Sequence, residues 1–247
     1  MASGTSQTQP YMDKVPELRK KFLDNHYSSD KNHFDARDIS RVKTDDYFVV
    51  QFINPKQGNI EKAHKLMTDA LKWRKSFGIN DLTEKDIPEE ILRSGVMYVH
   101  GKDKTGALTV FHRLKHYTYK GNKEMQLGYQ RMAALRYEQY QRENPGGKIT
   151  NVTSCEDVKL LQVDMDTNKL MINSLTTYYP DILEHMYILH YTKVFEALWK
   201  ITKVLLGPIA KKFAFISNEE LTTYIDKENL PVEFGGPSYV YEYHPEE

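Results

Sequence analysis

The chain has 247 residues, 40% of them hydrophobic, which is enough to bury a full core. Its 34 basic and 34 acidic side chains cancel, which excludes a whole-molecule attraction to nucleic acid or anionic lipid. The lone Cys155 excludes an internal disulfide, and no apolar run is long enough to span a membrane. The first residues also show no pattern of a secretory leader. We therefore expect a cytoplasmic protein that contacts membranes only peripherally and binds no nucleic acid.

The first third of the chain has a helical pattern. Residues 1–12 are rich in Ser, Thr and Gln and are expected to form a disordered tail. Residues 13–93 then carry apolar side chains at three- and four-residue spacing, as at Ala63 and Leu66, with a break at Pro55. This part shows no strand pattern, so it predicts a small helical lobe.

Residues 94–245 change in character and predict an α/β lobe. Strands at 96–100 and 108–111 flank a glycine-containing loop, which is typical of an antiparallel hairpin, and a long helix follows at 123–142. Further strands and helices then alternate, at 149–155, 165–178, 186–190, 193–206, 213–217 and 218–225. Alternation of this kind predicts a mostly parallel sheet.

The helix expected at 193–206 is apolar around most of its circumference. Glu196, Lys200 and Lys203 occupy one narrow stripe, and the apolar arc spans roughly 200°. A single core contact needs about half of that arc. The segment is therefore either a helix buried on two sides or a lid with a cavity beneath it.

A search for catalytic or metal-binding patterns finds none, so we expect no enzyme, no metal and no cofactor. His112 and His116 stand four residues apart at the end of a strand, and we interpret them as surface histidines. Asp164 and Asp166 are interpreted as the cap and first turn of the helix that follows.

Several short motifs resemble a known family. They are Trp73-Arg74-Lys75, Tyr178-Tyr179-Pro180, Leu206-Gly207-Pro208 and the segment 228–236, Glu-Asn-Leu-Pro-Val-Glu-Phe-Gly-Gly. Their order and spacing resemble the CRAL-TRIO family of lipid-binding and lipid-transfer proteins. The resemblance implies a helical N-terminal lobe and an α/β lobe with an apolar lipid slot. A gating helix at 193–206 would close the slot in solution and open it at a membrane.

The resemblance also implies a function and site residues. We expect a monomer that carries one hydrophobic lipid or phospholipid between membranes; the alternative is a lipid sensor that recruits a protein partner without net transfer. A phosphoinositide or other phospholipid is favoured. The expected lipid contacts are Tyr98, Phe111, Met171, Leu175, Val194, Phe195, Leu198, Ile201, Thr202 and Leu205. The expected headgroup contacts are Asp181, Lys203 and Lys56, and the expected membrane contacts are Trp199, Lys200, Leu206, Lys211 and Lys212.

Two departures from the family pattern bear on the slot. The strand at 149–155 is polar where the family has an apolar strand, so either the slot is polar there or the strand register differs. Before the gating helix, Thr192 replaces the usual proline and is expected to cap the helix.

Overall fold

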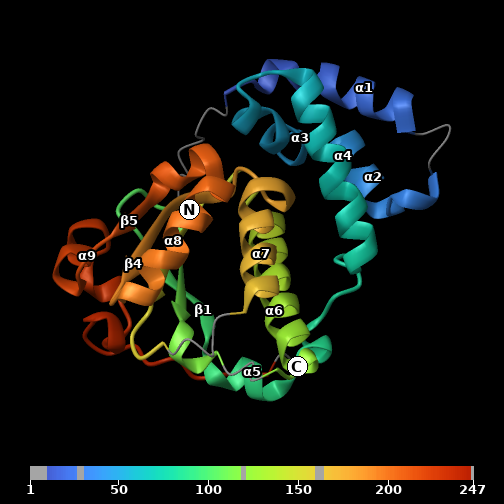
Figure 1. Ribbon diagram of the computed structural model, residues 1–247. Coiled ribbons are helices and arrows are strands. Elements are labelled where there is room, and N and C mark those ends of the chain that lie inside the picture. Colours follow the sequence, from blue (N-terminus) through green and yellow to red (C-terminus); the bar gives the residue numbers. More distant parts are fainter. Residues whose placement is uncertain (1–9, 27–30, 118–120, 159–163, 246–247) are drawn as a thin grey trace, which may run out of the picture. The chain divides into compact units, whose positions relative to one another are not determined.

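The computed structural model describes residues 10–26, 31–117, 121–158 and 164–245, without the side chains of His26, Lys31, Val194, Ala197 and Leu198. The chain folds into two compact units (Figure 1). The first consists of Met1–Leu82, Tyr137–Gly147 and Ser174–Ile182; the second consists of Thr83–Arg136, Lys148–Asn173 and Leu183–Glu247. Helix α6, Lys123–Glu143, therefore contributes residues to both units.

The first unit is helical, as the sequence predicts. Its helices are α1 Val15–His26, α2 Ala36–Thr44, α3 Asp46–Ile53 and α4 Ile60–Phe77. Phe22, Phe48, Phe52 and Met67 are fully buried and form its core. Helix α4 packs on α1 and α3.

A buried ion pair joins α4 to the end of α6 within this unit. Arg74, which is 1% exposed, donates from its two Nη atoms to the carboxylate of Glu138 at 2.6 and 2.9 Å. Burial alone would raise the pKa of Glu138, but the hydrogen bonds and charge of Arg74 lower it to about 2. Tyr179 donates its hydroxyl to the same carboxylate at 3.2 Å. The Trp-Arg-Lys and Tyr-Tyr-Pro motifs thus meet in the core of this unit.

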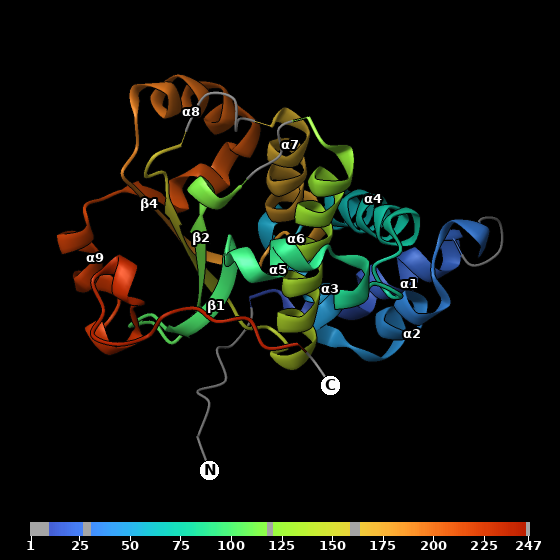
Figure 2. The same ribbon diagram turned by 90° about the horizontal axis from the view of Figure 1, so that it is seen from below.

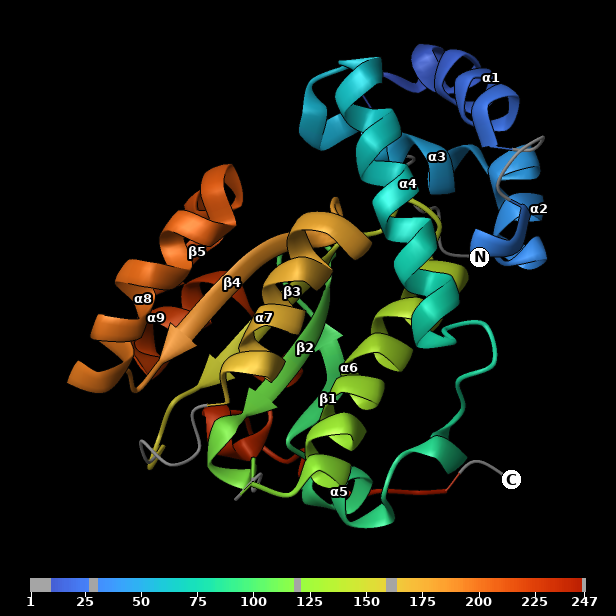
Figure 3. The ribbon, with the colours of Figure 1, turned by 45° about the vertical axis from the view of Figure 1, so that its right-hand side comes forward.

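The second unit is built on a five-stranded sheet. Its strands are β1 Met97–Lys102, β2 Leu108–Arg113, β3 Ile149–Ser154, β4 Leu183–Leu189 and β5 Phe213–Phe215, in the order β1-β2-β3-β4-β5. Strands β1 and β2 are antiparallel and every later pairing is parallel. Figure 3 shows this sheet, and the predicted mixed α/β fold is confirmed.

Helices lie on both faces of the sheet. They are α5 Glu89–Ser94, the first part of α6, α7 Met165–Asn173, α8 Lys193–Leu206 and α9 Asn218–Tyr224. Figures 2 and 3 show α6 and α7 on one face and α9 on the other. Behind the second face, Phe111 and Val152 pack with Leu221 and Phe234.

Local signals set several of these boundaries. Ser217 and Glu220 form a capping box at the start of α9, and the Thr192 side chain caps α8 by accepting from the Phe195 amide at 3.4 Å. The single helix predicted at 165–178 is instead α7 followed by a π-helical turn, Ser174–Tyr178. No helix in the described ranges is long and apolar enough to cross a membrane.

Candidate functional site

The second unit contains a cavity of about 160 Å³ between one face of the sheet and helices α6, α7 and α8. Apolar and aromatic side chains make up most of its wall. The described residues that line it are Val96, Met97, His112, Leu114, Tyr117, Tyr129, Met132, Ala133, Cys155, Val158, Asp164, Thr167, Asn168, Met171, Thr192 and Phe195.

The strand residues in this wall are not the predicted ones. Met97 and His112 are cross-strand partners, and both line the cavity. Tyr98 and Phe111, which we expected to contact lipid, pack on the opposite face with Phe234. Successive side chains of a strand alternate between the two faces of the sheet. An error of one residue in this alternation therefore assigns a side chain to the wrong face.

The predicted helix residues divide between the cavity and other places. Met171 on α7 and Phe195 on α8 line the cavity. Leu175 is buried within the first unit, and the half-buried Thr202 is not in the cavity wall. Side chains of Val194 and Leu198 fall outside the described residues, so their expected contacts stay predictions.

The rotation of α8 about its axis also differs from our expectation. Ile201 and Leu205, which we placed against the slot, are 60% and 61% exposed, as is Val204 at 79%. The two apolar side chains expected to face a membrane, Trp199 and Leu206, turn inward instead. Trp199 packs on Phe215 with ring centroids 5.1 Å apart, and Leu206 is buried. An apolar arc of this width does not determine which part of it faces inward.

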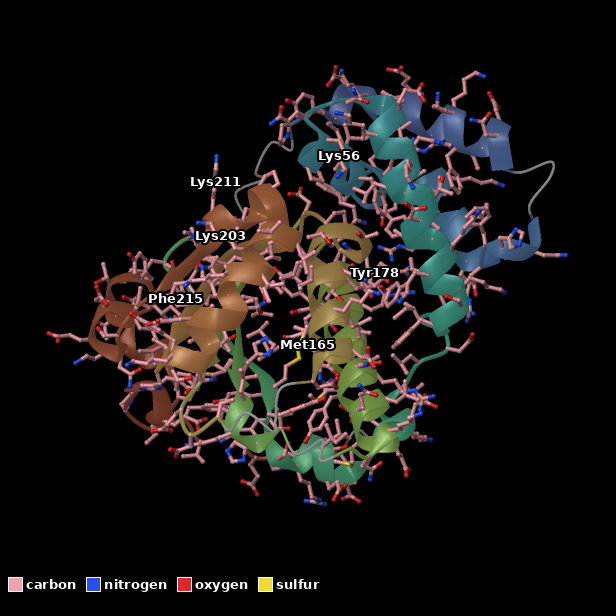
Figure 4. All side chains as sticks on the ribbon, viewed as in Figure 1. Lys56, Met165, Tyr178, Lys203, Lys211 and Phe215 are labelled. Carbon is pink, nitrogen blue, oxygen red and sulfur yellow. The ribbon has the colours of Figure 1, made fainter. Side chains whose placement is uncertain are left out.

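Two of the three lysines expected to contact a membrane are exposed, and so is Lys203, which was expected to contact a headgroup. Lys200, Lys203 and Lys211 all project into solvent, the last two as labelled in Figure 4. Lys212 is different, because its ammonium donates to the backbone carbonyl of Leu183 at the start of β4. Exposed lysines beside exposed apolar side chains suit an anionic, apolar surface.

The predicted headgroup residues lie in different units. Asp181 and Lys56 belong to the first unit, and Lys203 belongs to the second. Within the first unit, the Asn54 amide donates to the Asp181 carboxylate at 2.7 Å. Asn54 therefore occupies a carboxylate oxygen of Asp181 that a ligand would otherwise use. The headgroup role of all three predicted residues stays a prediction.

His112 is the main correction to the polar residues, because it is a cavity residue rather than a surface histidine. It is only 8% exposed, and burial lowers its pKa to about 4, so the ring is neutral at pH 7. The ring hydrogen-bonds Asn151 on β3. Its Nε2 has no hydrogen-bond partner within the described part of the chain.

Asp164 lies in the cavity wall and caps α7 as predicted. It accepts from the Asp166 amide at 3.0 Å and from the Thr167 hydroxyl at 2.6 Å. Tyr117 and Gln126 add bonds of 2.5 and 2.8 Å. Burial alone would raise the pKa of Asp164, but these donors lower it, so the carboxylate is ionised at pH 7.

Strand β3 is polar and buried, but it is not part of the cavity wall. Thr150 and Asn151 are completely buried, and Thr150 donates to the Asp103 carboxylate at 2.6 Å. The strand runs at Ile149–Ser154, close to the predicted strand, and none of its residues is among the described residues that line the cavity. Cys155 follows in the cavity wall, where burial raises the pKa of its thiol to about 12.

The sequence contained a signal for one of the residues that we missed. The apolar stripe of α6 includes Met132, so helix periodicity could have identified this cavity residue. Tyr117 follows the last strand residue too irregularly for any periodicity to identify it. No group of three potential metal ligands occurs in the described ranges.

Two curated relatives are similar to most of this chain. Phosphatidylinositol transfer protein CSR1 of Eremothecium gossypii is 24% identical over 204 residues, covering 77% of this chain and 47% of the relative. Phosphatidylinositol/phosphatidylcholine transfer protein SFH7 of Arabidopsis thaliana is 26% identical over 228 residues, covering 81% and 41%. The chain thus spans less than half the length of either relative. Both names describe transfer proteins.

A solved structure and a family model agree with the fold described above. The crystal structure of Sfh5 matches with a TM-score of 0.65 at 16% identity, covering 94% of this chain and 86% of that one, which supports the fold alone. The model of the CRAL/TRIO domain matches residues 92–236, more than half of the chain. The mixed sheet, the internal cavity and this match together place the chain in the CRAL/TRIO domain family.

Proposed function

We propose that this protein binds one lipid in the cavity of its second unit and carries it between membranes. The observation that supports this most directly is the position of α8. Phe195 on this helix lines the cavity, while Ile201, Val204 and Leu205 on the same helix are exposed to solvent. One element thus connects the cavity to a surface suited to a bilayer. The transfer proteins named among the relatives support the same function.

The energetics explain why a carrier would be needed. A two-chain phospholipid exposes some thirty methylenes in water, at about 0.8 kcal/mol each, so unassisted desorption costs more than about 20 kcal/mol. A protein that covers the chains in transit removes most of that barrier.

The cavity must enlarge before such a lipid can enter. Its volume of about 160 Å³ is below the roughly 300–1,000 Å³ of pockets for drug-sized ligands. We propose that α8 moves outward during loading. Its ends suit such a movement, because His190 before it has φ 53° and Gly207 after it has φ 57° and ψ −133°, a conformation essentially confined to glycine.

Docking would be weak and reversible. Burying the exposed parts of Ile201, Val204 and Leu205 contributes about 1–2 kcal/mol each, and each nearby lysine contributes about 1 kcal/mol at an anionic surface. This sum suits a monomer that works in the cytoplasm and visits membranes briefly. Phosphoinositide or another phospholipid remains the favoured cargo, with Lys203 of the second unit proposed near its headgroup. The headgroup role of Asp181 and Lys56 in the first unit stays a prediction.

Within the family, we also propose a finer similarity. Residues 34–38, 99–101 and 200–208 resemble the lipid-binding domain of motile sperm domain-containing protein 2.

The test is a matched pair of variants on α7. Met171 lines the cavity, whereas Met165, labelled in Figure 4, is 58% exposed on the same helix. Met171→Glu places a charge in the cavity and should abolish the bound lipid seen by native mass spectrometry, while Met165→Glu should leave it unchanged. Equal lipid content in both variants would refute the cavity assignment. Bound lipid that does not exchange between vesicles would instead favour the lipid sensor.

A further inference from the structure

Residues 237–243, which we call the strap, cross the face of the sheet that points away from the cavity. The strap begins where the match to the family model ends, at residue 236. Figure 2 shows it, drawn in red, passing β1 towards α5. All of its contacts described below lie within the second unit.

Tyr241 makes the central contacts of the strap. Its ring stacks on Tyr98 of β1 with ring centroids 4.7 Å apart, and its hydroxyl donates to the backbone carbonyl of Leu92 in α5 at 2.7 Å. Burial raises the pKa of Tyr241, so the hydroxyl keeps the proton that it donates. The strap thus joins the end of α5 to the start of β1.

Contacts on either side of Tyr241 fix the strap further. Tyr239 stacks on His100 of β1 with centroids 3.6 Å apart, and the Tyr243 hydroxyl donates to the Glu84 carboxylate at 3.1 Å. The three tyrosines are spaced by two residues, so in an extended segment their side chains point the same way.

The strap packs on the corner at which α5 ends and β1 begins. Gly95 forms this corner with φ 59°, and a Cβ there would lie 2.5 Å from the Tyr241 ring and 1.9 Å from the Arg113 guanidinium. Arg113 donates to the backbone carbonyls of Ser94 and Gly95, each at 2.7 Å. Its guanidinium also lies 5.3 and 5.9 Å from the ring centroids of Tyr98 and Tyr241.

The residues that follow this corner belong to the cavity wall. Val96 and Met97 both line the cavity, and the carbonyl of Val96 accepts from the Arg113 amide at 2.8 Å. Gly95 before them and Tyr98 after them both contact Tyr241. This part of the wall therefore cannot move away from the cavity without breaking the contacts of the strap.

We infer that the strap keeps the β1 side of the cavity rigid and thereby limits the bulk of the lipid chains that the cavity accepts. A rigid, close-packed wall excludes chains that are too wide, because overpacking is unfavourable. Tyr241 is a positioning residue, since it contacts the wall from behind and not the cargo. This inference rests on the proposed function and adds a limit on chain shape, without changing the expected phospholipid headgroup.

Two phosphatidylcholines that differ only in their chains test the inference. The dipalmitoyl and diphytanoyl lipids share a headgroup and a main-chain length, but the phytanoyl chains carry methyl branches. The protein is incubated with dioleoyl phosphatidylcholine vesicles that contain equal minor amounts of both. Native mass spectrometry then measures the ratio of straight-chain to branched lipid bound. We expect at least tenfold more straight-chain lipid on the wild-type protein.

Variants assign this ratio to the strap. Tyr241→Ala should reduce the ratio below about three. Tyr224→Ala is the matched control, because Tyr224 stacks on Tyr187 of β4 at the same 4.7 Å, and Tyr187 is not among the described residues that line the cavity. This control should preserve the ratio. Hydrogen–deuterium exchange should become faster in the peptide around Met97 only in the Tyr241 variant.

Thermal unfolding checks that each variant is folded. If Tyr241→Ala is not, Tyr241→Phe decides the matter: it loses only the hydrogen bond to Leu92, and we expect the ratio to fall at least twofold.

The outcomes separate the two proposals. If the wild-type protein binds both lipids equally, lipid binding stands and the inference is wrong. The inference is also wrong if the ratio survives in the folded Tyr241 variant, or falls as far in Tyr224→Ala. If the wild-type protein takes up no lipid from the vesicles and yields none in native mass spectra, the proposed function fails and the inference fails with it.

Discussion

At the scale of single residues, a buried ion pair stabilises the first unit. The Arg74–Glu138 pair is almost completely buried and has its hydrogen bonds made within the first unit. Removing one member of a buried pair leaves the other charge uncompensated, which typically costs about 3–5 kcal/mol. The buried pairing of Arg74 and the stacking of Trp73 on Tyr178 thus give the Trp-Arg-Lys motif a structural role in the first unit.

Glu138→Gln should lower the melting temperature by more than about 6 °C, because Arg74 loses its main counter-charge. Glu143→Gln is the matched control, since Glu143 is exposed at the end of the same helix. Differential scanning calorimetry measures the melting temperatures of both variants. A similar, small shift in the two proteins would mean that Arg74 is balanced by Asp38 alone, which lies 2.9 Å from it.

Lowering the pH should reduce the difference in the free energy of unfolding between the wild-type protein and Glu138→Gln. The pKa of Glu138 falls from its ordinary 4.5 to about 2 on folding, so its stabilisation is complete above about pH 4.5 and is lost as the pH falls towards 2. The pKa of Asp38 is raised, chiefly by burial, but Asp38 is present in both proteins. Urea unfolding at pH 3 to 7 should show the two stabilities converging by about 2 kcal/mol. If the difference in the free energy of unfolding stays constant with pH, folding does not lower the pKa of Glu138.

The same scale shows what the sequence could not predict about the cavity. Met171 and Phe195 were predicted lipid contacts and do line the cavity, because helix periodicity identified their apolar faces. Tyr98 and Phe111 were placed on the wrong face of the sheet. Both faces of the central strands are buried, so the pattern of apolar residues contained no alternation to reveal the parity.

At the scale of elements, the order of helices and strands was predictable while the orientation of α8 was not. Glycine, proline and capping residues marked the boundaries, as at the Ser217 capping box. The orientation of α8 depends on tertiary contacts, chiefly Trp199 with Phe213 and Phe215 on the edge strand β5. Those contacts turn Ile201, Val204 and Leu205 outward.

Val204→Ser should weaken binding to vesicles by about fivefold, because the change removes about 1 kcal/mol of apolar burial at the bilayer. Val240→Ser is the matched control in the same unit, since Val240 is also a valine and is 68% exposed. Vesicle flotation measures the binding of both variants to anionic vesicles. If the two variants bind alike, the exposed face of α8 is not the docking surface.

At the scale of the whole molecule, docking must depend on a local charge pattern, because the 34 basic and 34 acidic side chains cancel. Lys200, Lys203 and Lys211 supply exposed positive charge on α8 and just after it. A few charges of this kind are screened within about 8 Å at physiological salt. The protein should therefore respond to the surface charge of a membrane without binding tightly to it.

Lys200→Glu with Lys203→Glu should slow lipid transfer between anionic vesicles by at least tenfold, at about 1 kcal/mol or more for each reversed charge. Transfer between zwitterionic vesicles should change little. Lys227→Glu, an exposed lysine elsewhere in the second unit, serves as the control. An equal loss on both kinds of vesicle would indicate damage to the cavity rather than to docking.

The position of Cys155 gives this protein an internal reporter. It is the only cysteine of the chain, it lies in the cavity wall, and burial raises the pKa of its thiol from 9.0 to about 12. The reactive thiolate is thereby about a thousandfold scarcer than for an ordinary thiol at neutral pH. Alkylation should occur only while the cavity is open and empty. Its rate in the unaltered protein therefore measures how often the cavity opens, and added cargo that fills the cavity should slow it.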